Sequence, residues 1–245
     1  MWTTRNTAIL SGQSRQGVDF KLECLLWAFA ALFVVGCDSG DLEKLEALES
    51  AGQPTDIFTV TCSVCHGVNG EGKPELFSPS IAGLPWWYVE AQMKQFRDGH
   101  RGVHPDDLPG MQMHAISLSL TDEQIKEVSQ MVAAMPPFIT PPPAADVDLK
   151  SARYRYANEC MACHRYNGTG DRVFQSAPLI TLDRAYLERQ LKHYRDGLRG
   201  AVPGDLYGVK MVDACRELSD EDILELVDYI GALANGDDPR VAWER

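Results

Sequence analysis

Two pentapeptides, Cys62-Ser63-Val64-Cys65-His66 and Cys160-Met161-Ala162-Cys163-His164, determine what this chain can fold around. Their Cys-x-x-Cys-His spacing is that of c-type haem attachment, in which two thiols bond to the porphyrin and the next residue offers an imidazole to the iron. Residues three apart lie on one face of a helical turn, so both sulfurs can reach one porphyrin edge. The sequence therefore predicts two haem c groups, one held by Cys62, Cys65 and His66, and the other by Cys160, Cys163 and His164.

The two motifs belong to a longer internal repeat. Cys160 follows Cys62 by 98 residues, and the same offset places Gln92–Gly102 over Gln190–Gly200 and Met113 over Met211. Four cysteines could also hold a zinc ion. A zinc site, however, has no use for a repeated downstream methionine, whereas haem iron accepts a thioether as its sixth ligand. The repeat therefore favours two haems with histidine and methionine as axial ligands.

The choice of methionine follows from the repeat. In the second half, Met161 lies inside the attachment motif, which leaves Met211. In the first half, Met113 lies over Met211 while Met111 lies over Val209, so the register selects Met113. Three histidines near Met113 could also bind the first iron. Apolar residues occupy the matching positions in the second half, so a bis-histidine arrangement repeated in both domains is excluded. One histidine as an iron ligand in the first domain alone stays open. These histidines are His100, His104 and His114, over Leu198, Val202 and Val212.

With these motifs in place, the chain resembles a class I cytochrome c repeated in tandem, as in the dihaem cytochromes of the c4 type. The resemblance covers roughly residues 50 to 235. It implies an all-α fold of two helical domains, each enclosing one covalent haem, and a periplasmic electron carrier. Tyrosines and arginines repeated in both halves are candidate contacts for the haem propionates, because arginine binds carboxylates through a bidentate fork. They are Tyr88, Arg97, Arg101, Tyr186, Arg195 and Arg199. The repeated Arg-Asp-Gly is equally explained as a helix end with glycine at C′.

The N-terminal segment carries a separate signal. An apolar run from Leu25 to Gly36 ends in Val34-Val35-Gly36 before Cys37, which resembles a bacterial lipoprotein signal. The run is shorter than the ~20 residues that a membrane span needs, and it fits the apolar region of a secretory signal. We therefore expect Cys37 to be lipidated and the mature protein to be tethered to the membrane in the periplasm. An uncleaved short anchor is the alternative.

The remaining sequence divides around a proline-rich stretch. Met135 to Pro143 contains five prolines, which favours an extended and semi-rigid spacer that limits how the domains face each other. Thr121 to Gln124 predicts a capping box at a helix start, Ser219 to Asp222 is a looser version, and no strand pattern stands out. The predicted segments are a signal (1–37), a tether (38–49), a first domain (50–134), a linker (135–149), a second domain (150–236) and a tail (237–245).

The net charge of the chain and the expected iron ligands limit the classes of function that are possible. The chain has 23 basic and 35 acidic side chains, for a net charge of −12, which argues against nucleic-acid binding. An acidic surface suits docking on a basic patch of a redox protein, and it equally keeps a protein soluble. Because a methionine fills the sixth site of each iron, we expect a carrier of single electrons between a respiratory donor and a terminal oxidase or reductase, rather than an enzyme.

Two alternatives stay open at this stage. A dihaem peroxidase or thiosulfate dehydrogenase would need one open or cysteine-ligated iron. Cys215 would be the cysteine, although a lone cysteine is more often a small buried apolar residue, and Ser117, of similar size, is its counterpart in the repeat. The third possibility is a cytochrome subunit permanently bound to a dehydrogenase or oxidase complex, which the sequence barely separates from a free carrier.

Overall fold

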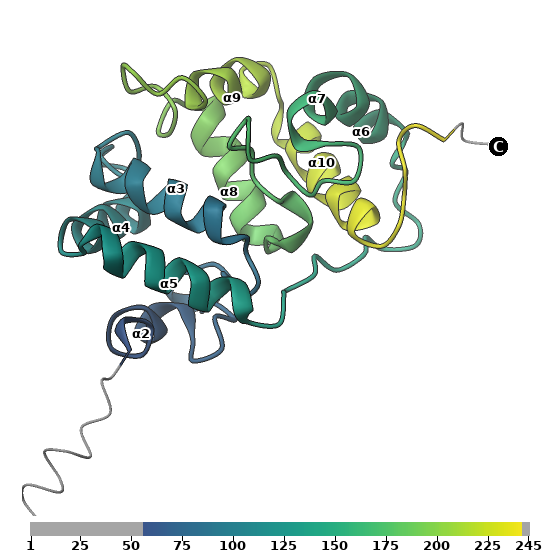
Figure 1. Ribbon diagram of the computed structural model, residues 1–245. Coiled ribbons are helices and arrows are strands. Elements are labelled where there is room, and N and C mark those ends of the chain that lie inside the picture. The colour runs from purple at the N-terminus through teal and green to yellow at the C-terminus, as the bar shows by residue number, and fades with distance from the viewer. Residues whose placement is uncertain (1–55, 242–245) are drawn as a thin grey trace, which may run out of the picture. The chain divides into compact units, whose positions relative to one another are not determined.

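The computed structural model describes residues 56–241, and in this part of the chain it contains helices but no strand (Figure 1). The predicted signal segment with Cys37, the whole predicted tether and residues 50–55 of the predicted first domain lie outside the described residues. No helix within residues 56–241 is long and apolar enough to cross a membrane.

The helices of the first domain begin at the attachment motif. A π-helical turn, η1, leads into the four-residue helix that ends at the histidine, and three longer helices follow. The elements are η1 (Phe58–Cys62), α2 (Ser63–His66), η2 (Pro74–Leu76), α3 (Trp86–Arg97), α4 (Leu108–Leu118) and α5 (Asp122–Ala134).

The second domain repeats this order at the predicted offset. The bounds of η3, α7 and α8 lie 98 residues after those of η1, α2 and α3. The elements are α6 (Lys150–Arg155), η3 (Tyr156–Cys160), α7 (Met161–His164), η4 (Leu179–Thr181), α8 (Arg184–Arg195), α9 (Gly208–Cys215) and α10 (Asp220–Ala234). The predicted all-α architecture of two tandem domains is confirmed.

Local sequence explains where the last helix of each domain begins. The Thr121 side chain accepts from Gln124 N, and the Gln124 side chain accepts from Thr121 N, which is the predicted capping box. Ser219 and Asp222 form the same reciprocal pair in the second domain, so the looser motif is a complete capping box. Each pair satisfies backbone N–H groups that a helix start otherwise leaves without partners.

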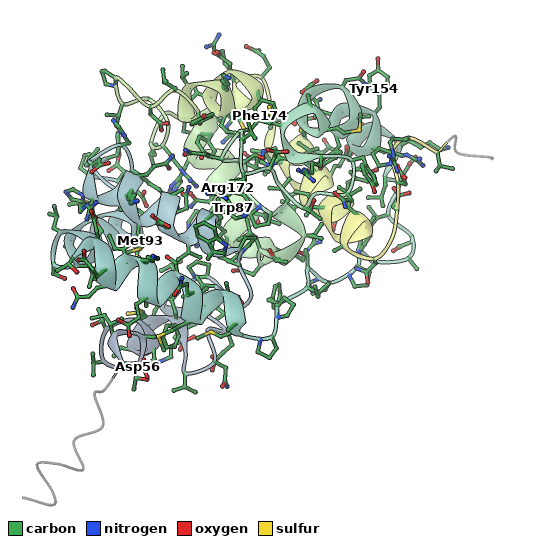
Figure 2. All side chains as sticks on the ribbon, in the orientation of Figure 1. Asp56, Trp87, Met93, Tyr154, Arg172 and Phe174 are labelled. Carbon is green, nitrogen blue, oxygen red and sulfur yellow. The ribbon has the colours of Figure 1, made fainter. Side chains whose placement is uncertain are left out.

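The two domains share one apolar core. Tyr88, Val128 and Val132 of the first domain pack in a single cluster with Leu187 and Ile230 of the second. Side chains fill the space between α3 and α8, and Figure 2 labels Arg172 and Trp87 in that region. Arg172 of the second domain stacks on Trp86 of the first domain, which is the residue before Trp87. The guanidinium carbon of Arg172 lies 4.8 Å from the centre of the Trp86 ring. The domains are therefore in direct contact.

The proline-rich linker is packed against the protein. Thr140 is fully buried, its N–H donates to Ile180 O at 2.9 Å, and its hydroxyl donates to Leu182 O at 2.7 Å. In the first domain, Phe138 N donates to Ala82 O. The linker thus forms hydrogen bonds with both domains. These bonds restrict the relative orientation of the domains in addition to the stiffness of the prolines.

Candidate functional site: two matched cavities

Each domain encloses one cavity beside its attachment motif. Counting the part open to solvent, the cavity of the first domain measures about 1200 Å³ and that of the second about 1340 Å³. Both are lined mainly by apolar side chains, as small-molecule and cofactor sites usually are. One layer of side chains separates them, since five residues line both cavities: Tyr88, Gln92, Leu182, Tyr186 and Gln190.

The predicted iron-binding histidines lie in these cavities in matching orientations. His66 Nδ1 lies 2.9 Å from Pro79 O, and His164 Nδ1 lies 3.0 Å from Ala177 O. Both rings are buried, and burial lowers the pKa of each imidazole, so both stay neutral. A neutral imidazole whose Nδ1–H is held by a carbonyl presents Nε2 as a lone-pair donor, which is the common arrangement of a metal-binding histidine.

The four predicted attachment cysteines line the same cavities. Cys62 and Cys65 lie in the first, and Cys160 and Cys163 in the second. None of the four forms a disulfide, so each sulfur is available for a bond to haem. Burial, aided by the charge of Asp56, raises the pKa of Cys62 to about 11, and burial raises that of Cys160 to about 12. Within residues 56–241 no three His, Cys, Asp or Glu side chains gather where they could hold a metal ion.

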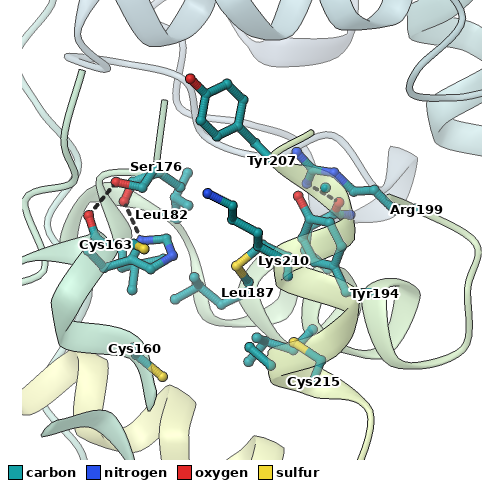
Figure 3. A pocket seen from close by; sticks show the side chains of 18 of the residues that line it. Cys160, Cys163, Ser176, Leu182, Leu187, Tyr194, Arg199, Tyr207, Lys210 and Cys215 are labelled. Atoms are coloured by element: carbon teal, nitrogen blue, oxygen red, sulfur yellow. Dashed lines mark hydrogen bonds between the residues drawn. The ribbon is translucent and has the colours of Figure 1, made fainter. Parts of the chain in front are cut away.

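The methionines chosen by register also line the cavities. Met113 on α4 faces the first cavity, and Met211 on α9 faces the second. Met111 does not line the first cavity and is 42% exposed. Figure 3 shows Cys163 and Lys210 at the second cavity. His164 ends α7 and Met211 lies on α9, so the histidine and the methionine come from different helices.

A close backbone contact positions the helices that carry these methionines. A Cβ on Gly102 would lie 2.2 Å from Gly110 O, and one on Gly200 would lie 2.6 Å from Gly208 O, so only glycine fits at these turns. Two buried carboxylates hold the starts of these helices. Asp107, the N-cap of α4, accepts from Gly110 N at 3.0 Å. Asp205 accepts at 2.7 Å from the N–H of Gly208, the first residue of α9. This arrangement fixes where each methionine enters its cavity.

The candidate propionate contacts divide into two groups. Arg101 and Arg199 line the cavities, as do Tyr88 and Tyr186. Arg97 and Arg195 do not line them. Arg97 pairs with Asp122 at 2.7 Å, and Arg195 with Asp220 at 2.6 Å. Arg97 and Arg195 thus join helices of one domain, and their contact with the haem propionates stays a prediction.

Arg101 and Arg199 have the features of partners for an anion. Both guanidinium groups are buried, and within residues 56–241 neither forms an ion pair with a carboxylate. Arg101 Nε is buried without a hydrogen-bond partner in this part of the chain. A buried cation is costly unless an anion compensates it. The two haem propionates of each domain would provide that charge, so the residues present fit a haem.

The histidines considered as other ligands lie elsewhere. The ring of His114 contacts Phe96 O, and His104 approaches Asp106. His100 Nε2 would lie 3.4 Å from a Cβ at Gly204, in the second domain. Cys215, in contrast, lines the second cavity one helical turn after Met211, and burial raises the pKa of its thiol to about 12.

Sequence reasoning passed over two pairs of residues that shape the site. Gln92 and Gln190 lie in the wall between the cavities, and Asp107 and Asp205 each accept a backbone N–H at the start of a methionine-bearing helix. Both pairs are identical at the 98-residue offset. This identity between the two halves could have marked these residues as candidates for the site. Polar residues that recur in a turn or on a helix do not by themselves reveal a role, however.

Comparison with known proteins assigns the family. The cytochrome c family model matches residues 55–135 and 152–234, which is one match for each domain. The chain belongs to the cytochrome c family, and with two attachment motifs it carries two covalently bound haem c groups, as predicted. It is accordingly a protein of electron transfer.

Similar proteins carry names of two kinds. A "thiosulfate dehydrogenase electron acceptor" of Stutzerimonas stutzeri (strain A1501) is 31% identical over 179 residues, covering 69% of this chain and 77% of that protein. Cytochrome c4 of Azotobacter vinelandii is 24% identical over 180 residues, covering 70% of this chain and 84% of that protein. The predicted likeness to cytochrome c4 is confirmed.

Solved structures agree on the fold. Cytochrome c4 of Pseudomonas stutzeri matches with a TM-score of 0.54 at 23% identity, covering 74% of this chain and 96% of that one. A thiosulfate dehydrogenase of Marichromatium purpuratum matches with a TM-score of 0.53 at 26% identity. The latter match covers 69% of this chain but only 36% of the solved chain, so this chain corresponds to about a third of that protein.

Proposed function

We propose that this protein is a membrane-tethered periplasmic dihaem carrier that takes single electrons from a dehydrogenase and passes them to a respiratory oxidase or reductase. We further propose that its donor is a thiosulfate dehydrogenase. His66 with Met113, and His164 with Met211, are the proposed axial ligands. Cys62, Cys65, Cys160 and Cys163 are the proposed attachment points.

One observation carries the proposal of a carrier. Each cavity contains both a neutral buried histidine held through Nδ1 and a methionine from a different helix. In each cavity the histidine and the methionine would both be ligands of a bound haem iron, which would leave no position for a small substrate. Bound haem supplies a one-electron iron couple, and methionine in place of a second nitrogen ligand raises its potential.

The surrounding residues have their own tasks in this proposal. The carbonyls of Pro79 and Ala177 orient the imidazoles and increase their basicity. The apolar walls exclude water, which also sets the potential of a buried centre. Arg101 and Arg199 neutralise the propionates near the wall between the cavities.

The choice of donor rests on the relatives. Two of them, from Stutzerimonas stutzeri and Thiomonas intermedia (strain K12), are named electron acceptors of thiosulfate dehydrogenase. This chain covers 77% and 73% of their lengths. Its acidic surface would guide it towards a basic patch on the donor and would raise the association rate, an effect that salt weakens.

Stopped-flow absorbance tests the proposed role. The oxidised, haem-loaded protein is mixed with thiosulfate in the presence or absence of a catalytic amount of thiosulfate dehydrogenase. We expect both haems to become reduced only when the enzyme is present, at a rate that falls as salt rises. Absence of enzyme-dependent reduction would remove thiosulfate dehydrogenase as donor while leaving the carrier role open to other dehydrogenases.

One observation favours a second candidate function. Cys215 lines the second cavity one turn from Met211, where a cysteine-ligated iron of a thiosulfate-oxidising enzyme could form. The raised pKa of its thiol opposes ligation by thiolate. Thiosulfate oxidation by the isolated protein with an artificial electron acceptor, abolished by Cys215→Ser, would establish this enzyme activity in place of the carrier.

The proposed tether requires its own test. Cys37→Ser in the full chain, followed by cell fractionation, should release a lipoprotein from the membrane. Retention at the membrane with unchanged apparent size would instead indicate an uncleaved anchor.

A further inference from the structure

Four side chains form a closed hydrogen-bonded ring between the two domains. Gln92 Oε1 accepts from Arg101 Nη1 at 2.6 Å and from Arg199 Nη2 at 2.7 Å. Gln190 Oε1 accepts from Arg199 Nη1 at 2.6 Å and from Arg101 Nη2 at 3.2 Å. Each amide oxygen thus receives one bond from its own domain and one from the other.

The ring follows the internal repeat. Gln190 and Arg199 lie 98 residues after Gln92 and Arg101. The guanidinium of Arg101 stacks on Phe96 at 4.3 Å, and that of Arg199 stacks on Tyr194 at 4.6 Å, again at matching positions. The contact is therefore two-fold in pattern, like the isologous interface of a symmetric dimer.

The ring lies in the layer that both cavities share. Gln92 and Gln190 are buried and line both cavities, while Arg101 lines the first and Arg199 the second. All hydrogen bonds of the ring involve a charged donor, and such bonds are shorter and stronger than neutral ones. Within a buried layer they also resist exchange with water.

We propose that Gln92 and Gln190 are positioning residues for the electron exchange between the two haems. By accepting from both arginines, each glutamine ties one domain to the other and fixes the separation and orientation of the two cavities. The exchange moves one electron: one haem iron passes from ferrous to ferric as the other passes from ferric to ferrous, and no bond or proton is transferred. Its rate falls steeply with separation, so a loosened ring slows it.

Other contacts keep the domains associated when the ring is cut. Arg189 Nη2 donates to Phe77 O at 2.9 Å, Ser80 N donates to Asp183 Oδ2 at 3.3 Å, and apolar side chains pack across the boundary. Loss of the ring should therefore loosen the orientation without separating the domains.

The test is the double variant Gln92→Leu/Gln190→Leu in the haem-loaded protein, with exchange measured after pulse reduction by less than one electron per molecule. We expect the exchange rate to fall by an order of magnitude or more, while the spectra still show six-coordinate iron in both domains. Residual dipolar couplings should report a wider range of domain orientations. The matched control is Gln130→Leu, because Gln130 is exposed on α5, lines neither cavity and lies outside the ring.

A second double variant separates hydrogen bonding from packing. Gln92→Glu/Gln190→Glu retains the accepting oxygens, so exchange should stay close to the wild-type rate although the added charge lowers both potentials. An unchanged rate in the leucine pair, or an equal loss in the leucine and glutamate pairs, would overturn the proposal. If the leucine pair does not take up both haems, Gln92→Leu and Gln190→Leu are compared singly, and each should give a partial loss. The measurement is intramolecular, so its result is independent of which dehydrogenase serves as donor.

Discussion

The two domains share one backbone plan, but they differ at the residue that follows the histidine. Gly67 has φ 81° and ψ 157°, and Arg165 has φ 66° and ψ 163°. This region of conformational space is almost restricted to glycine. The fold of the attachment loop therefore requires this backbone conformation in both domains. In the second domain an arginine adopts it, although arginine is poorly suited to a positive φ.

Arg165 forms an ion pair in the second domain that has no counterpart at Gly67 in the first domain. Arg165 donates through Nε and Nη2 to Asp171 Oδ2 at 3.0 and 2.8 Å. The corresponding residue of the first domain is Lys73, whose Nζ donates to Val64 O at 2.6 Å instead. The comparison teaches that the repeat constrains the backbone more tightly than the side chains.

The largest expected effect comes from removing the attachment cysteines of one domain. Cys62→Ala/Cys65→Ala and Cys160→Ala/Cys163→Ala should each leave a protein with one covalent haem, because each pair serves one cavity. The affected domain should also lose helical order, since a cavity of about 1200 or 1340 Å³ cannot be filled by its own side chains. Haem staining, intact mass and circular dichroism measure both effects. Cys215→Ser is the control, and a loss of haem from that variant would contradict the assignment.

The next effect concerns the axial methionines. Met113→Ala and Met211→Ala should each remove about half of the weak sulfur-to-iron absorption of the oxidised protein and lower one reduction potential, because the thioether raises the potential. Met111→Ala should leave the absorption intact, since Met111 is exposed. The reverse result in the first domain would show that the register does not select its ligand.

A smaller effect follows from the left-handed position. Arg165→Gly should raise the free energy of unfolding by about 1 kcal/mol through relief of backbone strain, and Gly67→Arg should lower it by about 2 kcal/mol. Chemical denaturation of the haem-loaded variants measures both. Equal effects of the same sign would refute the comparison.

The stability difference between Arg165→Gly and wild type should also depend on pH. Hydrogen bonding to Arg165 holds the pKa of Asp171 below its usual range, so the ion pair is present above that range and is lost as the pH falls through the depressed pKa. Below it, wild-type protein keeps the strain of Arg165 without the ion pair. The advantage of Arg165→Gly over wild type should therefore increase on acidification, and it should be smallest near neutral pH.

The smallest expected effect compares the two capping boxes. Thr121→Ala and Ser219→Ala should each destabilise by about 1 kcal/mol, the usual cost of removing a cap. Thermal unfolding of the haem-loaded variants measures the loss. Thr121→Ser is the conservative control, because serine can accept the same bond, and a loss as large as with alanine would exclude the cap as the cause.

The internal repeat made most of the fold predictable from the sequence, together with the cavity positions of the proposed iron ligands, whose binding to iron stays a prediction. One offset places two helix-forming patterns, two attachment motifs and two methionines in register. The structure keeps this offset in the bounds of η1 and η3, of α2 and α7, and of α3 and α8. Arg97 and Arg101 could not be told apart, because both recur at the same offset. Only packing shows that Arg97 contacts Asp122 while Arg101 enters the wall of the first cavity.

The glutamine ring was beyond prediction for a different reason. Gln92 and Arg199 lie 107 residues apart, and their contact depends on how one domain turns against the other. Helical periodicity and capping motifs describe local structure and carry no information on that orientation. Repeated polar residues on the buried face of α3 and α8 were the only trace of it in the sequence.

The two-fold pattern of the ring means that the surface of each domain is complementary to itself. Gln92 and Arg101 offer the same acceptor and donor that Gln190 and Arg199 offer in return. Nothing in this contact requires the two domains to be joined in one chain. A single domain bearing this glutamine and arginine would pair with a second copy of itself through the same bonds, so the covalent linker makes permanent an association that would otherwise depend on concentration.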